Sequence, residues 1–110
     1  MMKSKICEAV SKKRVIKFYY EGLERIVQPH VYGKNKTTGK EFLRGYQVGG
    51  YSSSGRIPGW RLFDVSKISD VEITDETFDN PAPGYNRNDP QISHIGDCLK
   101  YSTYDKYYRR

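Results

Sequence analysis

The sequence is poor in cysteine, tryptophan and histidine, and it has no long apolar run. Its 110 residues include 2 cysteines, 1 tryptophan and 2 histidines, and 36% of the residues are hydrophobic. No apolar run approaches the roughly 20 residues of a membrane-spanning helix, so we expect no membrane partner. The first residues also lack the apolar core of a secretion signal, and we therefore expect a cytoplasmic protein.

The two cysteines, Cys7 and Cys98, lie far apart in the sequence, and neither belongs to a Cys-x-x-Cys pair. In a reducing compartment such residues most often behave as small buried hydrophobic side chains. A disulfide between the N-terminal helix and the tail is the less favoured alternative.

Patterns typical of catalytic and metal sites are also missing. His30 and His94 have no acidic residues at metal-ligand spacing, and we expect them at the surface or in packing contacts. There is no Gly-x-Ser-x-Gly motif, and the glycine-containing segments lack the ending of a phosphate-binding loop. The acidic residues at positions 70–79 lack the central glycine of a calcium loop. We therefore predict no enzyme, no metal and no cofactor.

The sequence does have an excess of positive charge, with a net value of +6. Residues 1–63 hold 13 Lys and Arg against 4 acidic residues, whereas residues 64–79 hold 1 lysine against 6 acidic residues. A basic body with one acidic segment favours an anionic partner that approaches from one side. A surplus of lysine that serves solubility alone is the alternative.

Hydrophobic periodicity predicts one helix and several strands. Residues 4–14 form the predicted helix, because Ile6, Ala9 and Val10 fall on one helical face. Five segments with strand-like alternation follow, and Gly22 can supply the positive φ of a tight turn after the first one. The five predicted strands are residues 15–20, 25–32, 41–48, 60–65 and 67–74.

Beyond the predicted strands the pattern changes. Residues 75–90 are rich in Pro, Asn and Asp and have no period, and residues 91–101 show a weak helical spacing. The last ten residues alternate tyrosine with charge, which is typical of a loosely ordered end. We predict one domain over residues 1–75 and a C-terminal extension, residues 76–110, that packs on the domain or is partly mobile.

A helix followed by five short strands is typical of a small barrel, and 110 residues suffice for one modest core. The predicted fold class is α+β, mainly β, with a short N-terminal helix and a five-stranded antiparallel barrel of the SH3-like or Sm-like kind. Residues 15–20 should pair with residues 25–32, and residues 60–65 should close the sheet. The expected core consists of Ile16, Phe18, Val27, Leu43, Leu62 and Val65.

Four features follow one another in a definite order. A helix with a basic end leads into a strand that ends in tyrosine over residues 9–20, and Arg25 and Pro29 lie in the next strand. Glu41-Phe42-Leu43 begins the third strand, and an arginine, an aromatic residue and a basic-Ile ending lie within residues 61–68. In this order the features resemble a WYL domain, a bacterial SH3-like or Sm-like module named for its Trp-Tyr-Leu tripeptide.

The resemblance extends over residues 5–75 and is partial, because Glu41 and Phe42 stand where the family has tryptophan and tyrosine. WYL domains are usually joined to a DNA-binding helix-turn-helix or to an effector, and nucleic acids or nucleotides are their expected ligands. The resemblance therefore implies a ligand-sensing module in bacterial regulation or defence. No such partner domain is recognisable here, so we expect action as a free-standing protein or as a subunit.

Basic and aromatic residues are interleaved in the predicted strands and could meet on one face at the barrel opening, with Tyr51 nearby. Arginine has planar, forked donors that suit phosphate, and rings between cations hold single-stranded nucleic acid by stacking. The alternative places the rings in the core and pairs Arg61 with a nearby acidic residue. The candidate binding residues are Lys17, Arg25, Arg44, Tyr46, Trp60 and Arg61.

These features predict a binding module that performs no chemistry. Its expected partner is a single-stranded nucleic acid or a nucleotide-like anion. The alternative is a protein-interaction or assembly subunit, or a homo-oligomer, that uses an edge strand and exposed tyrosines. Salt separates the two hypotheses, because nucleic-acid binding falls steeply with salt and association through an aromatic protein interface does not.

Overall fold

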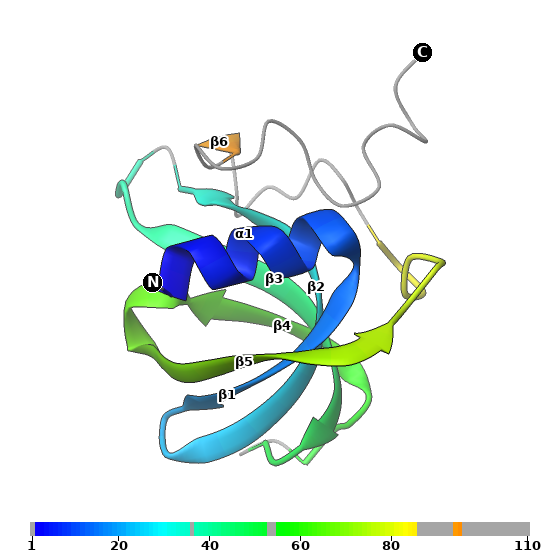
Figure 1. Ribbon diagram of the computed structural model, residues 1–110. Helices are drawn as coiled ribbons and strands as arrows, with labels where there is room; N and C mark the ends of the chain where they lie inside the picture. Colours follow the sequence, from blue (N-terminus) through cyan, green and yellow to red (C-terminus); the bar gives the residue numbers. More distant parts are fainter. Residues whose placement is uncertain (1, 36, 53–54, 86–93, 96–110) are drawn as a thin grey trace.

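The computed structural model describes residues 2–35, 37–52, 55–85 and 94–95, and every structural statement below concerns these residues. The sheet has the strand order β4-β3-β2-β1-β5, and β6 pairs with β2 (Figure 1). The elements are α1 (Met2–Lys12), β1 (Arg14–Tyr20), β2 (Leu23–Lys34), β3 (Glu41–Gly50), β4 (Gly59–Asp64), the 3-10 turn η1 (Val65–Lys67), β5 (Ile68–Thr77) and β6 (His94–Ile95).

The described part of the chain is mainly β, with one short helix and, as the sequence predicts, five consecutive antiparallel strands, β1 to β5, to which β6 adds a short pairing. β1 pairs with β2 in the predicted antiparallel manner, with Ile16 opposite Val27. Among the described strands, β4 pairs with β3 alone and β5 with β1 alone, so the sheet is open between β4 and β5. β4 therefore ends the sheet as an edge strand instead of closing it. The turn η1 leads directly from one edge to the other.

α1 packs across one end of the sheet, over β1, β2 and β5 (Figure 1). We call the sheet face that α1 covers the inner face. Ile6, Ala9 and Val10 are fully buried there, as the helical spacing predicts. The helix ends at Lys12 because the next residue, Lys13, adopts a left-handed backbone conformation with φ 57°.

The inner face holds the main hydrophobic core, and five of the six predicted core residues are buried in it. The exception is Leu62, which is half-buried. Phe63 is buried in its place, directly opposite the buried Leu43 of β3. Successive side chains of a strand point to opposite faces, so Leu62 belongs to the outer face of the sheet. The buried predicted residues are Ile16, Phe18, Val27, Leu43 and Val65.

Cys7 lies in this core and is disulfide-bonded. Burial of Cys7 agrees with the sequence-based expectation, but the expectation of a free thiol is wrong. Cys98 lies outside the described residues.

The outer face carries a second, smaller hydrophobic cluster, which residues 78–85 cover. Phe78 and Tyr85 belong to this cluster, and their rings lie 5.2 Å and 5.5 Å from the ring of His30 in β2. The N–H of Ala82 donates to Nε2 of His30 at 3.2 Å. In β4, Nε1–H of Trp60 donates to the carbonyl of Pro83 at 2.6 Å. We call residues 78–85 the covering segment.

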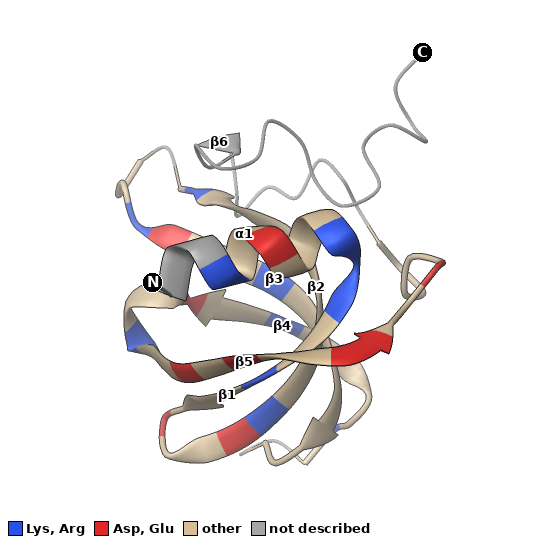
Figure 2. Cartoon of the chain, viewed as in Figure 1, with Lys and Arg blue, Asp and Glu red and all other residues tan. Residues whose placement is uncertain are grey.

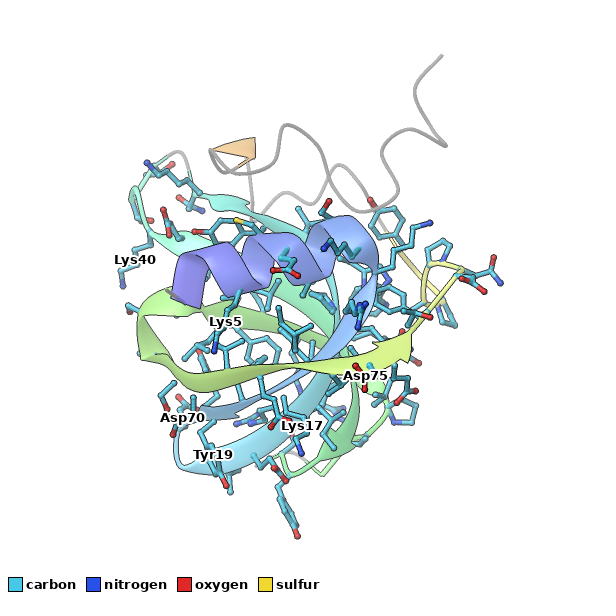
Figure 3. All side chains as sticks on the ribbon, in the orientation of Figure 1. Lys5, Lys17, Tyr19, Lys40, Asp70 and Asp75 are labelled. Carbon is cyan, nitrogen blue, oxygen red and sulfur yellow. The ribbon has the colours of Figure 1, made fainter. Side chains whose placement is uncertain are left out.

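Acidic residues gather along β5, and basic residues of α1 and β1 lie beside them (Figure 2). Lys17 of β1 lies 3.9 Å from the carboxylate of Glu72, and Arg14 lies 3.6 Å from that of Asp75 (Figure 3). Lys5 reaches from α1 and donates to the carbonyl of Val71 at 3.2 Å. Basic side chains of β1 thus neutralise part of the negative charge of β5.

Three further expectations concern absent or peripheral features. Within the described residues, no helix has the length and hydrophobicity to cross a membrane. The same residues contain no group of three or more His, Cys, Asp or Glu side chains placed to hold a metal ion. The weak helix predicted over residues 91–101 is wrong at His94–Ile95, which pair as β6 with β2. The rest of that segment lies outside the described residues.

Candidate anion-binding pocket

A cavity of about 340 Å³ opens between the β1–β2 turn and the loop that joins β3 to β4. Three arginines line it, together with one carboxylate and several rings. We call it the arginine pocket. Its lining residues are Tyr20, Glu21, Arg25, Ser52, Arg56, Trp60, Arg61, Leu62 and Phe63.

Two backbone features shape this cavity. The β1–β2 turn contains only Glu21 and Gly22, both with positive φ (54° and 77°), as a two-residue hairpin of type I′ requires. At the end of β3, Gly50 has φ 80°, and a Cβ atom there would lie 2.3 Å from the carbonyl oxygen of Glu24. The next N–H, of Tyr51, donates to that same oxygen at 2.7 Å. These contacts hold the β3–β4 loop against the β1–β2 hairpin.

Arg25 of β2 is the deepest charged group of the arginine pocket, with an exposed fraction of 4%. Its guanidinium donates to the side-chain oxygen of Gln47 at 3.4 Å and to the carbonyl of Tyr20 at 3.2 Å. The carboxylate of Glu21 lies 4.0 Å away. Nε of Arg25 is buried and has no hydrogen-bond partner in the described part of the chain. Arg25 lines the cavity, where an anion would offset its buried positive charge.

Burial lowers the pKa of Arg25, the negative charge of Glu21 opposes that shift, and the positive charge of Arg61 adds to it. Arg25 and Arg61 therefore lie close enough for their charges to destabilise each other. An anion between them would relieve this repulsion, because a nearby negative charge stabilises the charged form of each guanidinium.

Neutral groups hold Arg25 and Arg61 in position. Gln47 of β3 is fully buried and donates to the carbonyls of Gly49 and Tyr51 at 2.9 Å and 2.8 Å, so its oxygen faces Arg25. Arg61 of β4 donates to its neighbour's carbonyl, that of Trp60, at 3.0 Å. Its second guanidinium nitrogen donates to the hydroxyl of Ser52 at 3.1 Å and to the carbonyl of Arg56.

The lining of the arginine pocket thus has three guanidinium groups and one carboxylate, that of Glu21. Guanidinium groups form forked, charge-assisted hydrogen bonds with phosphate and carboxylate oxygens. A concave site of this size with convergent donors suits a small anion or one end of a larger one. The geometry of the described lining residues suits recognition of an anion.

The structure divides the six predicted binding residues between different places. Arg25, Trp60 and Arg61 line the arginine pocket. Lys17 lies on β1 next to Glu72 and does not line it. Arg44 and Tyr46 lie opposite Leu62 and Trp60, on the outer face, whereas Arg61 lies opposite Gly45 on the inner face. The expected common face for Arg44 and Arg61 is therefore wrong, because adjacent strand positions alternate between faces.

Trp60 is packed by other aromatic side chains. Its ring lies 4.9 Å from that of His30 and 5.2 Å from that of Tyr46, both in edge-to-face arrangements. The covering segment also accepts its indole N–H. The packing role that the sequence left open for Trp60 and Tyr46 is thus observed, whereas Tyr51, at 65% exposure, presents an accessible ring beside Ser52.

Sequence reasoning missed Tyr20, Glu21, Ser52 and Arg56 in the pocket lining and Gln47 behind Arg25. Glu21 lies in the tight turn after the first predicted strand, and Tyr20 ends that strand. Gln47 lies within the third predicted strand, and Ser52 and Arg56 lie between the third and the fourth. The available signal was the tight turn at Gly22 and the Gly49-Gly50 pair, which bring the two loops to the same end of the sheet.

Comparisons with known proteins give one fold likeness. No protein-family model matches the sequence, and no curated protein matches it. A solved structure of proteasome accessory factor B/C (PafBC) of Arthrobacter aurescens resembles the fold, with a TM-score of 0.55 and 21% sequence identity. The match covers 77% of this chain and 13% of the PafBC chain. At this identity the likeness concerns the fold alone, and this chain spans a small part of the PafBC length.

Proposed function

We propose that this protein is a WYL-like ligand-sensing module that binds a nucleic acid or nucleotide through the arginine pocket. The observation that supports the proposal best is Arg25, a guanidinium with 4% exposure that lines a cavity together with Arg56 and Arg61. Burying a cation costs free energy, and a phosphate in the cavity would add a second anionic partner beside the Glu21 carboxylate.

Two further observations support a regulatory module. The order of sequence features from α1 to β5 resembles a WYL domain, and the fold resembles part of a much longer solved chain, PafBC. A small mainly β fold that corresponds to 13% of a longer protein suits a sensing domain better than a self-sufficient enzyme. We therefore keep bacterial regulation or defence as the proposed setting.

A matched pair of arginine variants tests the proposal. Arg61→Gln removes a guanidinium from the arginine pocket, whereas Arg44→Gln removes one from the outer face of the neighbouring strand. We expect Arg61→Gln to weaken binding of a fluorescent single-stranded oligonucleotide about 10- to 100-fold, since a charge-assisted hydrogen bond contributes roughly 1.5–3 kcal/mol. The salt dependence should also flatten, by about 0.7–0.9 in log–log slope per lost phosphate contact. Arg44→Gln should change both quantities much less.

Thermal unfolding of each variant shows whether the fold is intact, because Arg61 also holds the β3–β4 loop through Ser52 and Arg56. Folded parent protein that binds neither single-stranded DNA, single-stranded RNA nor nucleotides at low salt would contradict the proposal. Equal losses in Arg61→Gln and Arg44→Gln would also contradict it.

A second candidate function, a protein-interaction or assembly subunit, has its own support. The described sheet has two unpaired edges, β4 and β5, and Tyr19 and Tyr51 are 45% and 65% exposed. Exposed edges and rings are typical of association surfaces. Lys5 and the acidic side chains of β5 oppose strand addition at one of these edges. Self-association that persists at high salt while oligonucleotides fail to bind would favour this function.

A cytoplasmic location remains part of the proposal. The disulfide at Cys7 argues against it, because structural disulfides are rare in reducing compartments. Alkylation of thiols in intact cells before lysis, followed by mass spectrometry of the Cys7 peptide, measures the state in the cell. A reduced Cys7 would agree with the cytoplasm, and an oxidised one would point to an oxidising compartment.

A further inference from the structure

We propose that the arginine pocket binds a terminal phosphomonoester, the end of a nucleotide chain or a free mononucleotide, in preference to an internal phosphodiester. This inference rests on the proposed function and specifies the part of the ligand that enters the pocket. Depth, charge and the arrangement of donors each support it.

Depth is the first argument. Arg25 lines the arginine pocket at an exposed fraction of 4%, so a ligand group must enter the cavity to reach its guanidinium. An internal phosphodiester carries nucleotides on both sides, and both hinder its close approach to a guanidinium this deeply buried. A cavity of about 340 Å³ lies near the lower end of the size range of small-molecule sites. A terminal phosphate therefore reaches Arg25 with less steric hindrance than an internal one.

Charge is the second argument. Among the described residues, the lining has the three cations Arg25, Arg56 and Arg61 against the one carboxylate of Glu21, a surplus of two positive charges. A phosphomonoester carries about −1.5 to −2 charges at pH 7, whereas a phosphodiester carries one. The lowered pKa of Arg25 reflects in part the nearby positive charge of Arg61. A dianion offsets this repulsion more fully than a monoanion does.

The donors are the third argument. In the described part of the chain, the guanidinium groups of Arg25 and Arg61 donate to neutral acceptors on Tyr20, Gln47, Ser52 and Trp60, which a charged oxygen can replace. A phosphomonoester presents three strong acceptor oxygens, one more than a phosphodiester presents to its surroundings. Tyr51, the sequence neighbour of the lining residue Ser52, has an exposed ring that is available to stack on the base that follows the phosphate.

The experiment compares one short single-stranded oligonucleotide in three forms: 5′-phosphorylated, 3′-phosphorylated, and with hydroxyls at both ends. Binding of each form is measured by anisotropy with an internal dye, and a nucleoside 5′-monophosphate serves as competitor. We expect at least about tenfold tighter binding for one phosphorylated form than for the hydroxyl form, since two or three charged hydrogen bonds are gained.

Arg56→Gln tests the pocket as the origin of this preference, because Arg56 is exposed and its replacement should leave the fold intact. The preference should shrink several-fold in Arg56→Gln and stay unchanged in Arg44→Gln, whose side chain lies on the outer face. A monophosphate that competes as well as the phosphorylated strand would identify the free nucleotide as the source. A strand that binds more tightly than the monophosphate would identify the strand end.

Failure of the inference is distinguishable from failure of the proposed function. Equal binding of all three forms, with Arg61→Gln still weakening each of them, would overturn the terminal-phosphate inference and leave the pocket as a binding site for internal phosphates. A preference that persists unchanged in Arg56→Gln would also overturn it. No binding of any form, or of the monophosphate, would overturn both.

Discussion

The hydroxyl oxygen of Tyr20 accepts a hydrogen bond from the backbone N–H of Asp64 at 3.0 Å. Tyr20 is the last residue of β1 and Asp64 is the last residue of β4, and these two strands do not pair in the described sheet. The ring of Tyr20 also packs edge-to-face on that of Phe63, at 4.9 Å. The side chain of Tyr20 thus links β1 to β4, two strands that backbone hydrogen bonds do not join, at a position next to the arginine pocket.

Tyr20→Phe should therefore destabilise the protein by about 1 kcal/mol, because it leaves the N–H of Asp64 without its partner and keeps the ring. Urea unfolding at neutral pH measures the loss as a lower midpoint. Tyr19→Phe is the matched control, since the neighbouring side chain is 45% exposed on the opposite face and should change the midpoint little. Equal midpoints for parent and Tyr20→Phe would show that the contact contributes nothing.

Phe18→Ala should cost on the order of 3–5 kcal/mol, the usual range for a large-to-small change in a core. Phe18 is 1% exposed and packs edge-to-face on Phe63 at 4.9 Å. Because domains of this size have only about 5–15 kcal/mol of stability, the variant should melt far below the parent or fail to fold. Leu62→Ala, at a half-buried position on the outer face, should cost clearly less. Similar melting of both variants would contradict the placement of Phe18 in the core and of Leu62 on the outer face.

Gly45→Ala should destabilise the sheet by about 1–3 kcal/mol through overpacking. A Cβ atom at Gly45 would lie 2.3 Å from Cγ1 of Val27 on the neighbouring strand, a distance that requires movement of a buried side chain. Gly49→Ala is the milder control, because its Cβ would meet the end of the Ile26 side chain at 3.2 Å. Thermal melts of the two variants should rank Gly45→Ala as the less stable, and the reverse order would refute the packing argument.

Alternation and turn chemistry made much of the fold predictable. Ile16, Phe18 and Tyr20 alternate in the segment that became β1, and Gly22 marks the tight turn before β2, so the pairing of β1 with β2 followed from local sequence. The register of β4 did not follow from local sequence. Trp60, Leu62 and Phe63 are all large and apolar, so the pattern does not show which of them face the core. The covering segment has no period, and its place on His30 and Trp60 depends on contacts distant in sequence.

The same reasoning explains why only part of the candidate site was predicted. Arg25 and Arg61 were among the candidates because the forked donors of arginine suit phosphate. Neither strand alone shows whether Arg44 or Arg61 faces the inner side. That depends on the pairing register of β3 and β4, in which Arg61 lies opposite Gly45. β2 and β3 also pair with two irregularities, which shift the faces within β2. Glu21 and Arg56 join the pocket through loop positions that only the folded sheet defines.

The last prediction concerns His30, which is fully buried beneath the covering segment. Burial lowers its pKa to about 4, against an ordinary value of 6.5, and the bond to the Gln28 carbonyl opposes this only in part. Nδ1–H donates to that carbonyl while Nε2 accepts from Ala82, an arrangement that requires a neutral ring.

Stability should therefore fall as the pH is lowered through the window from about 6.5 to about 4. In this window His30 is protonated in the unfolded chain and neutral in the folded one, so the unfolded state binds more protons and acid favours it. A difference of this size between the two pKa values lowers the free energy of unfolding by about 3 kcal/mol across this pH window. Urea unfolding at pH 7 and pH 4.5 measures most of that loss.

His30→Gln provides the comparison, because glutamine is polar and does not titrate. The variant should be less stable than the parent at pH 7, since it loses ring contacts with Trp60, Phe78 and Tyr85. Its stability should nevertheless fall less between pH 7 and pH 4.5, because only the carboxylates and the second histidine, common to both proteins, still titrate. Parallel pH profiles for parent and variant would mean that His30 does not stay neutral in the fold, and that the covering segment is not held by its Nε2.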